Sequence, residues 1–124
     1  MINRATFVTL DEDALVKRFA EICLAQDEAL LYSNIAKFNR LFDQMIAVEK
    51  ELRARLGDRR SALTTLFTHE NAQVRLQAAR ATLAVAPEEA LGVIKAIAGG
   101  RKFPQAGDAG MTLVNLERGI FKPT

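Results

Sequence analysis

The strongest constraint on the fold is one long apolar stripe between about Ser33 and Leu56. Its spacing follows the 3.6-residue period of an α-helix and places the stripe on one face. A helix of this length spans about 35 Å, so we expect it to be the spine against which shorter helices pack. Gly57 is expected to end it. The stripe consists of Ile35, Phe38, Phe42, Met45, Glu49, Leu52 and Leu56.

Glu49 is the one charged residue in this stripe. Two interpretations are open: the carboxylate lies at the rim and pairs with Arg53 four residues on, or it is a buried polar anchor. Burying an unpaired carboxylate is costly, which favours the rim.

An earlier helix is predicted to start at Thr9, because Thr9 and Glu12 have the spacing of a capping box. Its apolar residues also recur with helical spacing, and they include the single cysteine, so we expect a core thiol. These residues are Leu15, Phe19, Ile22 and Cys23.

Further helices are predicted after Gly57. Residues 60–68 favour a brief helix, and Asn71 can cap the next one. That next helix is apolar on two sides, which indicates burial on both. One side carries Val74, Ala78, Ala81 and Val85, and the other carries Leu76, Ala79 and Leu83.

The last two helices are predicted from their end signals. Pro87 suits a first helical position, and Gly99 with Gly100 suits a stop. Asp108 is expected to cap the last helix, and Gly119 to close it. Because no window shows sustained strand-type alternation, the sequence predicts an all-α fold.

The run LTTLFTHENAQVRLQAARATLAV, from Leu63 to Val85, resembles a HEAT-type repeat. The resemblance implies an armadillo-type α-α superhelix, with about six helices in a short right-handed stack of antiparallel pairs. Such repeats often place an Asp where it can meet the arginine of a neighbouring repeat, whereas this corner reads His69-Glu70-Asn71. The family's packing and inter-repeat arginine positions fall on Val74, Arg75, Ala78, Ala79 and Leu83. On the basis of this resemblance we expect 1–124 to be a single domain, with a degenerate pair over 9–56, the best repeat over 60–86, a last pair over 87–119 and a tail over 120–124.

The whole chain is also similar to a small bacterial family known only as a domain of unknown function. The resemblance rests on AKFNRLFDQM, ELRARLGD, VRLQAARATLAVAPEEA, FPQAGDAGM and the terminal GIFKPT. It implies a HEAT-like helical fold and a bacterial origin, but no activity.

Residues that carry chemistry are few. Cys23 and His69 are the only cysteine and histidine, so the usual zinc sites cannot be assembled. A nucleophile–base pair is disfavoured, because Cys23 lies on an apolar helix face and His69 on a predicted surface corner. We therefore expect no catalytic residue, metal or cofactor. The sequence shows no secretion signal or membrane-spanning stretch, and a lone cysteine suits a reducing compartment, so we expect a cytoplasmic protein.

Phosphate groups and nucleic acids are the two kinds of anionic ligand that basic segments of this chain could bind. The segment 99–110 combines glycines, basic residues and a helix start, so it is either an anion site or a structured connector. The sequence lacks a phosphate-loop pattern, and this favours the connector. A net charge of +2 and the absence of tryptophan argue against a nucleic-acid groove.

The leading hypothesis is a non-enzymatic module that binds an unidentified protein partner. One form of it is a bacterial toxin-neutralising (immunity) protein. A small phosphate- or nucleotide-binding regulator or enzyme using 99–110 is the alternative, and a weak nucleic-acid binder is the second. A homodimer of this protein is a further partner arrangement that the sequence leaves open. Phe103 is either an exposed anchor or docked on the core. The candidate interaction surface comprises Arg53, Arg55, Arg59, Arg60, Arg101, Lys102, Phe103 and Gln105.

Overall fold

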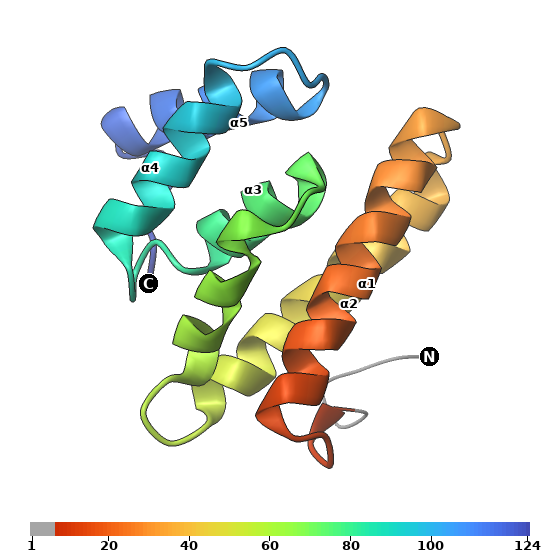
Figure 1. The fold of residues 1–124 in the computed structure, drawn as a ribbon, viewed down its shortest axis with the longest axis vertical. Helices are drawn as coiled ribbons and strands as arrows, with labels where there is room; N and C mark the ends of the chain where they lie inside the picture. Colours follow the sequence, from red (N-terminus) through yellow and green to blue (C-terminus); the bar gives the residue numbers. More distant parts are fainter. Residues whose placement is uncertain (1–6) are drawn as a thin grey trace. The chain divides into compact units, whose positions relative to one another are not determined.

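A computed structural model describes residues 7–124, and within that range the chain forms six helices and no strand (Figure 1). The predicted all-α class is therefore confirmed for the described residues. The chain divides into two compact units, called here the first unit (described residues 7–62) and the second unit (residues 63–124). In chain order the helices are α1 (Glu12–Leu31), α2 (Ile35–Ala54), the 3-10 helix η2 (Arg59–Thr68), α3 (Ala72–Ala81), α4 (Pro87–Ala98) and α5 (Gln105–Glu117).

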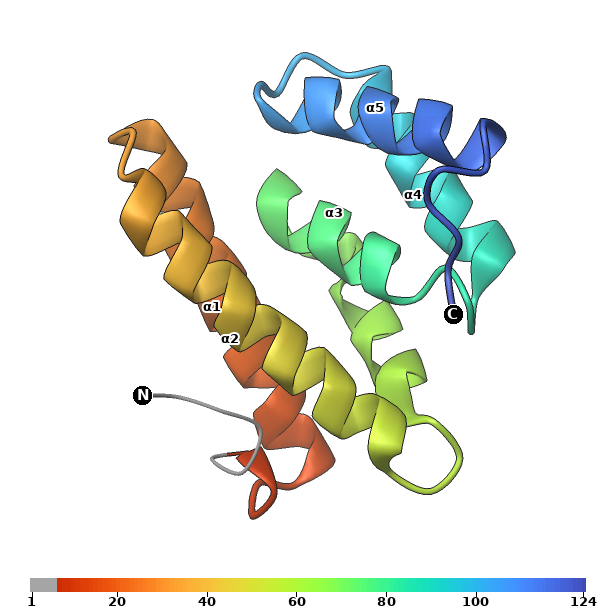
Figure 2. The same cartoon turned by 180° about the vertical axis from the view of Figure 1, so that it is seen from behind.

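The first unit is a hairpin in which α1 and α2 pack side by side (Figures 1 and 2). The predicted apolar stripe of α1 is buried, and Cys23 is a core thiol as expected. Only the middle of the α2 stripe is buried, because Ile35 and Leu56 are 60% and 98% exposed. The buried residues of the hairpin include Leu15, Phe19, Ile22 and Cys23 of α1, and Met45, Val48 and Leu52 of α2.

The start of α1 differs from the prediction. Asp11, not Thr9, is the N-cap, and its Oδ1 accepts a hydrogen bond of 2.8 Å from the Ala14 amide. A carboxylate at this position satisfies a free amide and also meets the positive end of the helix dipole, which a hydroxyl does only in part. The helix therefore begins at Glu12.

The ends of the hairpin helices are set by local backbone geometry. Ser33, at φ 54°, occupies the left-handed position after α1, and Asn34 then caps α2 through its side chain. At the other end α2 stops two residues short of Leu56, because Arg55 adopts an extended conformation. Gly57, at φ 80°, lies in the turn beyond rather than next to the helix end.

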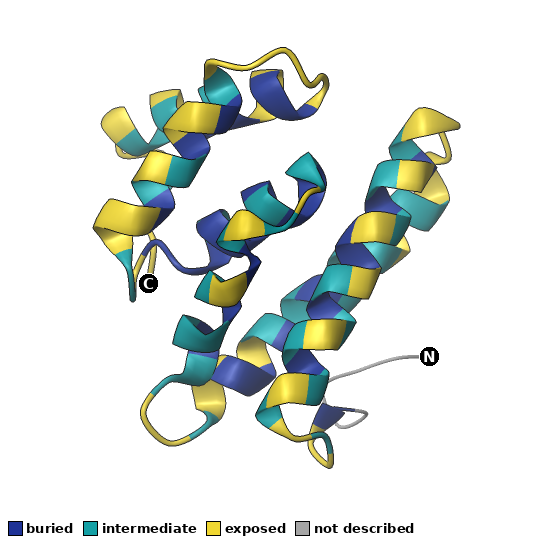
Figure 3. Ribbon diagram, viewed as in Figure 1, coloured by how far each residue is buried: buried dark blue, intermediate teal, exposed yellow. Residues whose placement is uncertain are grey.

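In the second unit, α4 packs against both α3 and α5. The predicted Asn71 cap and Pro87 start are confirmed, and α3 is buried on two faces as expected (Figure 3). The brief helix predicted over 60–68 is the 3-10 helix η2. The core cluster of this unit comprises Leu76, Ala79, Leu83, Ala90, Ile94, Ile97 and Ala109.

The last helix starts earlier than predicted, at Gln105, so Asp108 lies in its first turn and is not its cap. Pro104 is the N-cap, and its carbonyl accepts from the Asp108 amide at 3.0 Å. A proline costs little there, because the first amides of a helix have no intrahelical acceptor to lose. The end at Gly119 is confirmed: its φ is 70°, which favours glycine in the terminating turn.

Candidate interaction surface

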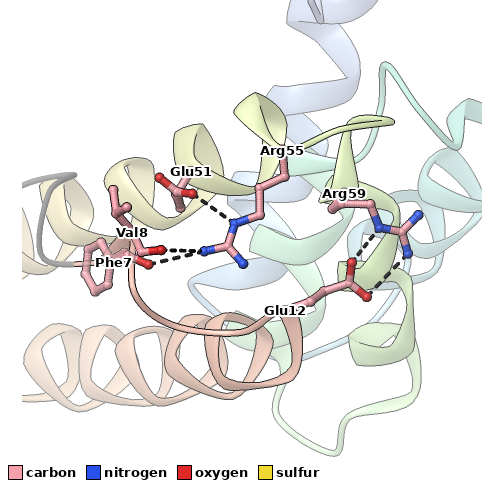
Figure 4. A network of polar contacts seen from close by, with 6 residues as sticks. All are labelled: Phe7, Val8, Glu12, Glu51, Arg55 and Arg59. Carbon is pink, nitrogen blue, oxygen red and sulfur yellow. Dashed lines mark hydrogen bonds and ion pairs between the residues drawn. The ribbon is translucent and has the colours of Figure 1, made fainter.

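Arg55 joins the end of α2 to the segment before α1 (Figure 4). Its Nε donates to Oε2 of Glu51 at 2.9 Å, and its Nη2 donates to the carbonyls of Phe7 at 3.4 Å and Val8 at 3.3 Å. The guanidinium thus neutralises a buried carboxylate and satisfies two carbonyls of an irregular segment. This arrangement assigns Arg55 a structural role in the first unit.

Arg59 forms a two-pronged ion pair with Glu12, 47 residues away in sequence (Figure 4). Nε donates to one carboxylate oxygen and Nη2 to the other at 3.3 Å. The hydrogen bonds from Arg59 lower the pKa of Glu12 below its ordinary value. Both side chains are partly exposed, so the pair is open to solvent and screening by salt.

Arg60 is 4% exposed, so its predicted place on an interaction surface is wrong. Its Nε and Nη2 donate to the two oxygens of Asp58 at 2.9 and 2.7 Å, and these bonds lower the pKa of that carboxyl. Arg53 is exposed. Three of the four guanidinium groups predicted as a basic corner therefore face carboxylates of the same unit, which reduces the field available to a nucleic acid.

The buried carboxylate near the end of α2 is Glu51, which is 7% exposed, whereas Glu49 is half-buried. The position of Glu49 agrees with the predicted rim. Sequence reasoning missed Glu51 because it lies outside the apolar stripe. Its spacing of four residues from Arg55 was the available signal.

The segment before α5 presents three exposed residues, Arg101, Lys102 and Phe103. Phe103 is 73% exposed, so the exposed alternative holds. Gln105 does not belong to this surface: it is 4% exposed, and its Nε2 donates to Oε1 of Gln73 in α3 at 3.0 Å. The early start of α5 turns Gln105 into the core, and half of the predicted 99–110 loop is helix.

Cys23 and His69, the single cysteine and histidine of the chain, each lie in a position with a structural explanation. Burial raises the pKa of the Cys23 thiol well above its ordinary value. His69 Nδ1 accepts from the Asn71 amide at 3.0 Å, in the corner between η2 and α3. Among the described residues, no three His, Cys, Asp or Glu side chains are grouped as metal ligands. Within residues 7–124, every helix falls short of the length and apolarity that a bilayer crossing needs.

The structure also forms a cavity in the second unit that sequence reasoning missed. Arg75 of α3 and Lys102 of the segment after α4 both line it. They lie 27 residues apart in sequence, and helical periodicity does not relate residues on different elements, so the sequence carries no signal for this pairing.

The chain resembles one solved protein over nearly its whole length. This is the protein RPA1889 from Rhodopseudomonas palustris CGA009, a crystal structure with 50% sequence identity and a TM-score of 0.92. The match covers 95% of this chain and 98% of that one. A search of curated proteins gave no match. The family described as "Domain of unknown function (DUF2019)" matches residues 13–117. The chain belongs to that family.

Proposed function

We propose that the protein is a non-enzymatic interaction module that binds a protein partner through Arg101, Lys102 and Phe103, the docking segment. The observation that carries this proposal is the 73% exposure of Phe103 between two exposed cations and a proline. Burying an exposed aromatic side chain of this kind contributes about 2–3 kcal/mol. The flanking positive charges select a partner whose surface is acidic around an apolar pocket.

The docking segment suits recognition because its ends are held. It follows α4 and precedes α5, which pack against each other. The Lys102 carbonyl accepts from the Ala106 amide at 2.7 Å, which ties the segment to the first turn of α5. A segment held in this way loses less conformational freedom on binding than a free loop.

The finer architecture we propose is HEAT-like, with η2 and α3 as one repeat, α4 and α5 as the next, and α1 and α2 as a degenerate pair. The packing of α4 on α3 and α5 supports it. Arg75 departs from the family pattern, because its Nη1 donates to the carbonyls of His69 and Glu70 in its own corner, at 2.8 and 2.9 Å.

Within this proposal the partner is a bacterial toxin, met in the cytoplasm, whose acidic active site the docking segment covers. The reduced, buried Cys23 suits that compartment. A toxin gene next to the gene for this protein would support the assignment. Neighbours of unrelated function would argue against it.

Affinity capture of the tagged protein from its native cells tests the proposal. We compare the wild type with Phe103→Ala and with Met111→Ala, a matched control that is 60% exposed in the same unit. A stoichiometric partner should be retained by the wild type and by Met111→Ala, and lost from Phe103→Ala without a change in melting temperature. Equal retention by Phe103→Ala, or a monomer with no stoichiometric partner, would overturn the proposal.

A further inference from the structure

A cavity of about 190 Å³ opens in the second unit. Its apolar lining comes from η2, α3 and α4, and its two charged residues come from α3 and from the segment after α4. All of the described lining residues lie within residues 63–124, the second unit. Its lining includes Phe67, Arg75, Val93, Ala96, Ile97 and Lys102.

The electrostatics of this cavity favour an anion. Among the described residues, Arg75 and Lys102 are its charged lining residues, and no acidic residue lines it. Arg75 Nη1 is held by two backbone carbonyls, whereas its Nε and Nη2 donate to none of the described residues. The Lys102 ammonium likewise makes no ion pair within residues 7–124.

The C-terminal end of α4 opposes anion binding here, but its partial negative charge is smaller than the charges of Arg75 and Lys102. The C-terminal end of α4 lies at the cavity through Ile97 and Gly100, and a helix C-terminus carries about half a negative charge. Two full positive charges exceed that. The cavity is therefore cationic at its polar side and apolar elsewhere.

The volume limits the size of the ligand. Pockets that enclose drug-sized molecules have volumes of about 300–1,000 Å³, so this cavity is too small for a nucleotide. One aromatic ring or one branched alkyl group, with an attached charged group, matches it better. A carboxylate fits Nε and Nη2 of Arg75, which make no hydrogen bond within residues 7–124 and present a planar fork.

We propose that this cavity binds a small organic carboxylate with a single aromatic ring or branched alkyl body. The carboxylate is held by Arg75 and Lys102, and the body packs against Phe67, Val93 and Ile97. This binding goes beyond the proposed protein interaction. Lys102 belongs to both the docking segment and the cavity lining, whereas Phe103 does not line the cavity, so a change at Phe103 separates the two.

The test is a titration of the full chain with phenylacetate and with isovalerate, followed by NMR and calorimetry. Phenylacetamide has the ring without the charge, and acetate has the charge without the ring. We expect binding in the range of about 1 mM for the two apolar acids. Phenylacetamide and acetate should each bind at least about tenfold more weakly. Equal binding of phenylacetate and phenylacetamide would overturn the proposal.

Variants locate the site. Lys102→Gln should weaken phenylacetate binding about fivefold, whereas Arg101→Gln, an exposed neighbour outside the lining, should leave it within about twofold. Ala96→Leu fills the cavity from the exposed side of α4 and should abolish binding, while Ala36→Leu on α2 should not.

Phe103→Ala should bind phenylacetate as the wild type does, even if it loses a protein partner, so failure of one proposal is distinguishable from failure of the other. Undetectable binding at about 10 mM phenylacetate, or unchanged affinity in both Lys102→Gln and Ala96→Leu, contradicts the assignment.

Discussion

The corner between η2 and α3 offers the sharpest test of how local chemistry stabilises this fold. Asn71 Oδ1 accepts from the amides of Gln73 at 2.8 Å and Val74 at 3.1 Å, so one side chain satisfies two of the first amides of α3. Asn71→Ala removes this acceptor, so the amides of Gln73 and Val74 lose their hydrogen bonds to Oδ1 in a half-buried site. Loss of an N-cap of this type typically costs about 1 kcal/mol, within a range of about 0.5–2 kcal/mol.

The size of the expected thermal shift follows from the length of the unfolding segment. Unfolding entropy is about 2.1 cal/mol/K per residue, or about 0.26 kcal/mol/K for all 124 residues, so a loss of about 1 kcal/mol lowers Tm by about 4 °C. If residues 63–124 unfold on their own, the entropy is halved and the same loss lowers Tm by about 8 °C. The size of the shift therefore also reports the cooperative unit.

Differential scanning calorimetry of three variants checks this reasoning. Asn71→Asp keeps an acceptor and places a negative charge at the positive end of α3, so its Tm should stay within about 1 °C of the wild type. Asn39→Ala, an exposed asparagine inside α2, is the matched control and should not lower Tm. An Asn71→Ala Tm equal to that of the wild type, or an Asn71→Asp protein as unstable as Asn71→Ala, would refute the capping argument.

Three further predictions concern the core, the charges and the thiol. Leu76→Ala should lower the free energy of unfolding by about 2–5 kcal/mol in urea titrations, because Leu76 is fully buried; a loss under about 1 kcal/mol would contradict its place in the core. The folded-state pKa values of Glu12 and Asp58 are lowered, so their pairs stabilise the fold above the unfolded pKa values and lose that contribution as pH falls through the folded ones. Urea midpoints should therefore drop below about pH 4, and less steeply in the Glu12→Gln, Asp58→Asn double variant; an equally steep drop would show that other groups control acid stability. Cys23 should react with iodoacetamide at neutral pH far more slowly in the native protein than in urea, measured by mass spectrometry, and equal rates would contradict its burial.

Arg101, Lys102 and Phe103 were proposed as surface residues from the basic composition of their segment and the neighbouring proline. The sequence left open whether Phe103 is exposed or docked on the core, and the structure shows it exposed. The prediction for Gln105 was wrong because α5 starts at Gln105 and not after Asp108. The earlier start places Gln105 on the buried face of the helix. The prediction for Arg60 was wrong because Asp58, two residues earlier, binds its guanidinium in a turn, and sequence spacing alone does not distinguish that pair from an open basic patch.

The sequence by itself determined the helices and most of their ends. Apolar periodicity identifies the buried face of α1, and the capping chemistry of Asn71, Pro87 and Gly119 depends only on residues within one or two turns. Only the tertiary structure decided which distant residues meet: Arg59 with Glu12, Gln105 with Gln73, and Arg75 with Lys102 at one cavity. The physical reason is the range of the interactions. Helical hydrogen bonds and caps join residues a few positions apart, whereas these contacts depend on how complete helices pack, which periodicity does not encode.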